Sequence, residues 1–134
     1  MSAGVFLDTV GLIAIWDDAD KWYERASLAF SELIKTGMLS FTTSFVLLEC
    51  GNTAARKPYR AAVERLRAKL EEGGRVIHPT MEDWNAAWIA YRRGENADAG
   101  IVDQVSFIVM RRLGLTQAFT NDRHFQAAGF EILF

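Results

Sequence analysis

The sequence predicts an α/β fold, a three-layer α/β/α sandwich with a short, mostly parallel central sheet. Short apolar runs alternate along the chain with longer segments whose apolar residues recur every three or four positions. This alternation is typical of βαβ units, in which helices connect parallel strands and cover the sheet. The 134 residues match the usual size of one domain, with no internal repeat or linker. We therefore expect residues 1–134 to form a single domain.

The first element is expected to be a buried strand at residues 4–8, because GVFLD is a short apolar run that ends in a carboxylate. Apolar residues continue to Trp16, so a helix or turn should follow the strand closely. The next helix is expected to begin near Asp20, which can cap it, and to end at Gly37.

The second strand is expected at residues 38–44, which combine β-branched and aromatic side chains. Ser44 is suited to cap the helix that follows this strand. Pro58 should interrupt that helix, and an amphipathic basic helix should then extend to Glu72.

A turn and a short third strand are expected in GGRVIHP, residues 73–79. Thr80 and Asp83 have the spacing of a capping box, so a helix is expected to begin there. Residues 94–100 are the most loop-like stretch of the chain.

A buried helix is expected from residue 101 to Gly114, because its residues are nearly all apolar until Arg111. The last two strands are expected in LTQAFT and GFEILF, on either side of the polar stretch TNDRH. In this scheme the strands and helices alternate to the end of the chain, as parallel connections require.

The composition is that of a globular protein, with 50% hydrophobic and 24% charged residues. No apolar run reaches the roughly 18 residues needed to cross a bilayer, and the first residues lack the features of a signal peptide. Cys50 is the only cysteine, which excludes an internal disulfide and a cysteine-rich zinc site. We expect a soluble, cytoplasmic protein that does not bind a membrane.

The net charge of −2 hides an uneven distribution of charge. Residues 1–50 carry seven acids and three bases, whereas residues 51–75 carry seven bases and three acids. The basic segment could be an ordinary solvated helix, or it could give an acidic protein one positive, phosphate-binding face.

Four acidic residues are expected to converge on one edge of the sheet. Asp8 ends the first strand, and Asp122 lies just beyond a late strand. Glu49 lies about one turn into the helix after the second strand, and Asp103 lies in the first turn of the apolar helix. Because sites in open parallel sheets form beyond the carboxyl ends of the strands, these positions predict a shared site.

Each acid also has an ordinary structural interpretation. Asp8 could cap the next helix, and Asp122 could form a turn with Asn121. Glu49 could be a solvated helix residue, and Asp103 could interact with the dipole of its helix. Each interpretation is reasonable for one residue, but four acids at one edge favour a common function.

Carboxylates crowded together repel one another and bind protons unless a cation is present. Their hard oxygen atoms favour Mg²⁺ or Mn²⁺ over Zn²⁺ or Cu²⁺, and Mg²⁺ sites commonly share their ion with substrate phosphates. The cluster therefore predicts phosphodiester chemistry.

Because a divalent ion already lowers the pKa of a water that it binds, this chemistry does not need His124 as a base. We assign His124 and His78 structural roles.

Four blocks of sequence, VFLDTVGLIA, TTSFVLLECGN, IVDQVSFIVMRRLGL and AFTNDRHFQAAGFEIL, span nearly the whole chain. In these blocks the chain resembles PIN-domain nucleases, and among them the VapC-type toxins of toxin–antitoxin pairs. The resemblance implies a PIN-like sandwich and a Mg²⁺- or Mn²⁺-dependent endoribonuclease. It also implies inhibition by a cognate antitoxin protein.

The resemblance places the four metal-binding and catalytic acids of the family on Asp8, Glu49, Asp103 and Asp122. It also places a helper hydroxyl on Thr120, which orients the metal or its water. All four metal-binding positions carry an acidic residue in this sequence.

Three further expectations concern partners of this site. Arg56, Lys57 and Arg60 are the candidates for steering RNA. Thr9, beside the first acid, matches a position where the family commonly has serine or threonine, and Asn52 is a candidate partner of Glu49. Apolar helical faces that the core does not need could form a homodimer interface.

Two other functions remain open. A catalytically silent PIN-like module, which only binds RNA or a partner, is expected to lack an acid, and here all four are present. A receiver-like signalling domain needs a lysine after a late strand, and residues 76–134 contain none.

We assign Trp22, Trp84 and Trp88 to packing rather than to base stacking, because they fall on the expected core faces of helices.

Overall fold

The computed structural model of the chain describes residues 4–134. The strands, in chain order, are β1 (Gly4–Leu7), β2 (Leu39–Thr43), β3 (Val76–Ile77), β4 (Gln117–Phe119) and β5 (Glu131–Ile132). The helices are α1 (Thr9–Trp16), α2 (Tyr23–Thr36), α3 (Ser44–Ala54), α4 (Arg60–Glu72), α5 (Met81–Arg92), α6 (Glu95–Asp98), α7 (Ile101–Leu113) and α8 (Arg123–Ala127). None of these helices is both long and apolar enough to cross a membrane.

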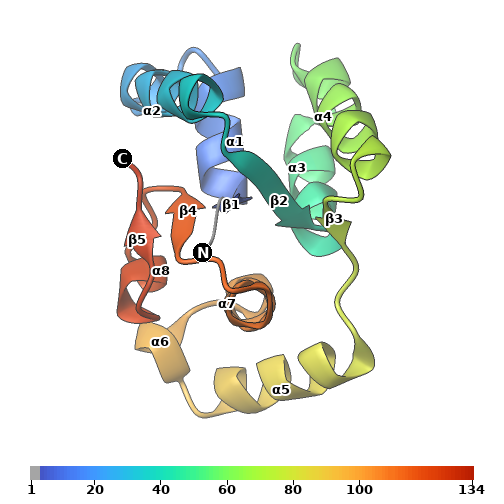
Figure 1. Ribbon diagram of the computed structural model, residues 1–134, viewed down its shortest axis with the longest axis vertical. Helices are drawn as coiled ribbons and strands as arrows, with labels where there is room; N and C mark the ends of the chain where they lie inside the picture. The colour runs from blue at the N-terminus through green and yellow to red at the C-terminus, as the bar shows by residue number, and fades with distance from the viewer. Residues whose placement is uncertain (1–3) are drawn as a thin grey trace.

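The strands form one parallel sheet in the order β3-β2-β1-β4-β5 (Figure 1). The chain moves outward from β1 through β2 to β3, and then crosses back to β4 on the other side of β1. Because connections between parallel strands are right-handed, this reversal puts α1 to α4 on one face of the sheet and α5 to α8 on the other. The predicted three-layer α/β/α sandwich is confirmed.

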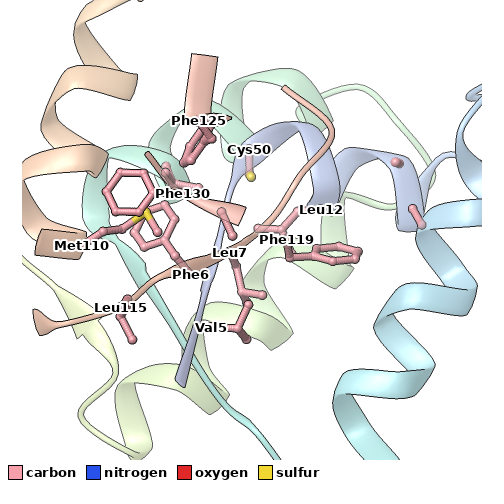
Figure 2. Packing of buried hydrophobic residues seen from close by; sticks show 14 of the residues in the cluster. Val5, Phe6, Leu7, Leu12, Cys50, Met110, Leu115, Phe119, Phe125 and Phe130 are labelled. Carbon is pink, nitrogen blue, oxygen red and sulfur yellow. The ribbon is translucent and has the colours of Figure 1, made fainter. Parts of the chain in front are cut away.

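The central strand β1 is buried on both faces. Phe6 packs toward α8, where the centre of its ring lies 6.4 Å from that of Phe125. On the opposite face, the centre of the Phe119 ring on β4 lies 5.3 Å from the centre of the Phe30 ring on α2. Figure 2 shows this core, which also contains the fully buried Cys50. A strand buried on both sides is held firmly, and this fixes the residues that leave its carboxyl end.

Most of the predicted helix boundaries are confirmed. Gly37 ends α2 in the left-handed conformation, and Thr80 and Asp83 form the predicted capping box at the start of α5. The cap of α3 differs by one position, because the hydroxyl of Thr43, rather than that of Ser44, accepts the bond from Val46 N at 3.1 Å.

Two stretches that we expected to be irregular contain short helical turns. The polar stretch TNDRH holds the start of α8, because the side chain of Asp122 accepts a hydrogen bond from His124 N over 2.9 Å and caps this helix. The loop 94–100 contains α6, whose backbone is left-handed at three consecutive residues.

The packing role expected for two tryptophans is wrong in part. Trp84 and Trp88 of α5 are 44% and 39% exposed. The small side chain of Ala87 makes the buried contact of α5 with α7 instead. The two indole rings lie edge to face on the outer side of α5, next to Phe45 and Tyr91. On this face only Trp84 contacts another element, through Phe45 of α3, and Trp88 and Tyr91 stay 39% and 48% exposed within the part of the chain that the structure describes.

Candidate active site

Asp8 leaves the carboxyl end of β1 and is only 2% exposed. Its carboxylate makes no capping hydrogen bond to α1, so the capping interpretation does not explain it. Instead, Oδ2 of Asp8 accepts a hydrogen bond from Oγ1 of Thr120 over 2.8 Å. The two residues lie side by side because β1 and β4 pair with Leu7 opposite Phe119, one residue before each of them.

The contact between Asp8 and Thr120 lies at the point where the strand order reverses. The chain leaves β1 toward β2, but returns to β1 on its other side as β4. Helix connections therefore diverge at this edge and leave room beyond the strand ends, which is where parallel sheets bind ligands.

Glu49 reaches the same edge from α3. Its Oε1 accepts a hydrogen bond from Oγ1 of Thr9 over 2.7 Å, and Thr9 directly follows Asp8. Glu49 is thus tied to the first turn of α1 and is not an ordinary solvated helix residue. Asn52 is exposed on α3, and its predicted pairing with Glu49 stays a prediction.

Asp103 and Asp122 meet on the side of α7 and α8. One oxygen of each, together with a ring nitrogen of His124, all lie within 4.8 Å of one another. Nδ1 of His124 is 2.7 Å from Oδ1 of Asp122. Sequence reasoning had set His124 aside as structural, but the structure places it in the acidic cluster. The sequence does hold a signal for this placement, because His124 follows Asp122 by only two residues and both belong to the same turn of the chain.

Asp122 serves the local structure as well as the cluster. It caps α8, and its own backbone N–H donates to Oγ1 of Thr120 over 3.0 Å. Thr120, which is fully buried, thereby links Asp122 to Asp8. The turn-forming interpretation of Asp122 is correct but incomplete.

The pKa values report how closely the acids interact. Burial raises the pKa of Asp8 from 3.8 to about 7, and the charges of Asp122 and Glu49 add to this, whereas the bond from Thr120 opposes it. Burial also raises the pKa of Asp103 to about 8, with contributions from Asp8, Asp122 and Glu49. All four predicted acids therefore belong to one electrostatic cluster.

Such a cluster is suited to a hard divalent cation. Deprotonating several crowded carboxylates is unfavourable in the protein alone, and a cation would offset their repulsion. The carboxylate oxygens match the ligand preferences of Mg²⁺ and Mn²⁺, whereas the imidazole of His124 is a ligand type that those ions use less readily. The acids that could hold such an ion are Asp8, Glu49, Asp103 and Asp122.

The predicted basic residues lie beyond the end of α3. Arg56, Lys57 and Arg60 are exposed. Arg60 donates from Nη1 to the carbonyl oxygen of Ala55 over 3.0 Å, so it stabilises the turn after α3. The three basic residues follow the end of α3 at Ala54, which lies five residues, or about 7.5 Å of helix rise, beyond Glu49.

A family model for the PIN domain matches residues 5–131. The chain belongs to the PIN-domain family. Its sequence is 31% identical, over 127 residues, to the 23S rRNA-specific endonuclease VapC20 of Mycobacterium tuberculosis. This match covers 94% of the chain and 95% of the relative.

Two solved structures resemble this fold. The crystal structure of Mycobacterium tuberculosis VapC20, described as a Sarcin-Ricin loop cleaving toxin, has a TM-score of 0.77 at 26% identity and covers 95% of this chain and 96% of its own. FitAcB from Neisseria gonorrhoeae has a TM-score of 0.64 at 17% identity, covering 97% of this chain and 96% of its own, and shares the fold. The family resemblance inferred from the sequence is confirmed.

Proposed function

We propose that this PIN-domain protein is a metal-dependent endoribonuclease and the toxin of a type II toxin–antitoxin pair. The observation that carries the proposal is the convergence of Asp8, Glu49, Asp103 and Asp122 at the strand-order reversal, with Asp8 and Asp103 holding raised pKa values. Similarity over 94% of the chain to an endonuclease that acts on 23S rRNA supports RNA as the substrate.

The four acids are proposed to hold Mg²⁺ or Mn²⁺. A bound divalent ion supplies positive charge to the scissile phosphate and lowers the pKa of an attacking water. Thr120 keeps Asp8 oriented toward the ion by its hydrogen bond, and Thr9 does the same for Glu49. The ring of His124 contacts Oδ1 of Asp122 through Nδ1 over 2.7 Å and holds this acid in place.

RNA is proposed to approach across the exposed end of α3. Arg56 and Lys57 carry positive charge just beyond the end of α3, the helix that carries Glu49. Their charges would attract the phosphate backbone without reading its sequence. Binding through them should therefore weaken as the salt concentration rises.

The proposed partners are a cognate antitoxin and a second copy of the chain, and the proposed location is the cytoplasm. A two-fold dimer is supported by the outer face of α5. Met81, Trp84, Trp88 and Tyr91 recur there at intervals of three, four and three residues, and each is between 39% and 72% exposed. Helices pair readily along apolar stripes of this spacing.

The test is cleavage of total ribosomal RNA by protein purified free of antitoxin. Wild-type protein is expected to cleave with Mg²⁺ or Mn²⁺ and to stop with a chelator. Asp8→Asn should lower the rate by at least 100-fold, whereas Asp18→Asn, at an exposed acid outside the cluster, should leave it unchanged. Equal cleavage by wild type and Asp8→Asn would refute the proposal. Metal-independent RNA binding without cleavage would favour the catalytically silent module.

A further inference from the structure

The chain is left-handed just before α7. Asn96, Ala97 and Asp98 each have a φ angle of 59°. This conformation is disfavoured for every residue that has a Cβ atom, and consecutive residues rarely share it. Ala97 and Asp98 are exposed, so burial does not impose it on them. Something else must hold this turn in place.

The side chain of Gln104 holds it. Gln104 is 1% exposed, and its Nε2 donates to the carbonyl oxygen of Glu95 over 2.8 Å and to that of Ala99 over 3.3 Å. Its Oε1 accepts from Nδ2 of Asn96 over 2.8 Å. One buried amide therefore bonds to both ends of the left-handed turn and to a residue within it.

This turn lies next to the acidic cluster. Gln104 directly follows Asp103 in the first turn of α7, and the N-cap of that helix, Gly100, has no side chain that could cap it. The left-handed turn also packs against α8, which begins directly after Asp122 (Figure 1). It therefore contacts α7, which carries Asp103 of the cluster in its first turn, and α8, which Asp122 of the cluster caps.

We propose that Gln104 is a positioning residue for the metal-binding acids. By holding the turn 96–98, it fixes the start of α7 at the place where Asp103 meets Asp122. Without its bonds, two backbone carbonyls lose their partners, and the turn relaxes toward an ordinary conformation. The uncapped first turn of α7 then moves with it, and the carboxylates of Asp103 and Asp122 no longer share one ion. This inference rests on the proposed metal-dependent function.

The first test is Gln104→Met, which keeps the length of the side chain but removes all three hydrogen bonds. Affinity for Mn²⁺ is measured from the signal of free Mn²⁺ in electron paramagnetic resonance, with protein purified free of antitoxin. Groups that orient metal ligands typically change affinity by 10- to 100-fold. We therefore expect Gln104→Met to bind Mn²⁺ at least about 10-fold more weakly than wild type, with the helical circular dichroism retained.

A rescue experiment separates positioning from general stability. Glycine adopts the left-handed conformation freely, so Ala97→Gly should hold the turn without Gln104 and restore a large part of the Mn²⁺ affinity to Gln104→Met. Ala61→Gly, at an exposed position in the regular helix α4, is the matched control and should restore none. Because these affinities are compared only among variants that keep the helical circular dichroism, the difference reports the position of the acids and not the folded fraction.

A milder variant covers the case in which Gln104→Met does not fold. Asn96→Ala removes one of the three bonds at a half-buried position and should weaken Mn²⁺ binding about threefold. If wild type binds Mn²⁺ and the variants bind it equally well, or if both glycine substitutions rescue alike, the role of Gln104 is disproved. If wild type itself binds no Mn²⁺, the proposed function fails instead.

Discussion

Oγ1 of Thr120 donates a hydrogen bond of 2.8 Å to Oδ2 of Asp8, across 112 residues of sequence. The same oxygen accepts from the backbone N–H of Asp122 over 3.0 Å. A single buried hydroxyl thus joins the ends of two neighbouring strands to the start of α8. Its loss should affect the orientation of two acids at once.

Thr120→Val keeps the shape of the side chain and removes this hydroxyl. Because the bond from Thr120 lowers the pKa of Asp8, the variant should raise that pKa further and move the rise of activity to higher pH. We expect the cleavage rate at neutral pH to fall about 10- to 100-fold, as for other groups that orient metal ligands. Thr120→Ser should restore most of the rate. A pH–rate profile identical to that of wild type would contradict this role.

The stability of the metal-free protein should fall as the pH rises. Asp8 and Asp103 have pKa values of about 7 and about 8 in the folded protein, against 3.8 as the ordinary value. Between about pH 4 and pH 8 the native state therefore binds more protons than the unfolded state, and the free energy of unfolding decreases with pH in this window. Melting curves in a chelator should show this decrease, and Asp103→Asn should reduce it.

Added Mn²⁺ should act in the opposite direction. Metal binding displaces protons from the carboxylates, so the affinity for Mn²⁺ should rise between pH 6 and pH 8. The stabilisation that Mn²⁺ gives in melting curves should grow over the same range. Stabilisation independent of pH would indicate that the ion does not bind at these acids.

Gly11 is expected to tolerate no side chain. A Cβ atom there would collide with the carbonyl oxygen of Phe119, where α1 passes close to the end of β4. Gly11→Ala should therefore lower the free energy of unfolding by about 1–3 kcal/mol. Gly51→Ala, in α3 with open space around it, should instead stabilise by roughly 0.5–1 kcal/mol. Urea unfolding of both variants tests this contrast, which would be wrong if they shifted stability alike.

The exposed face of α5 should govern the oligomeric state. Trp88→Glu places a charge in the middle of the apolar stripe and should convert a dimer to a monomer, because a buried charge needs a partner. Leu28→Glu is the control, since Leu28 is 70% exposed on α2, away from α5. Light scattering after size-exclusion chromatography measures the mass. A monomeric wild type, or a dimeric Trp88→Glu, would refute the interface.

Local sequence patterns were enough to predict the layers of the fold and the edge at which the acids gather. Alternating apolar runs and helical periodicity are local properties, and they predict βαβ units before any contact is known. The position of Asp8 at the end of an apolar run follows in the same way. So do the ends of helices such as Gly37 and the box at Thr80, because caps depend only on neighbouring residues.

How these residues meet depends on contacts between distant parts of the chain, which the sequence patterns do not contain. The pairing of Asp8 with Thr120 depends on the register of β1 against β4, and sequence periodicity does not contain a register. His124 joins the cluster because Asp122 starts a helix there, where only an irregular turn was expected. Trp88 is exposed because α5 packs on α7 through another face, where Ala87 is buried and Asp83 pairs with Arg112. Periodicity marks a helical face, but the neighbouring elements determine which face is covered.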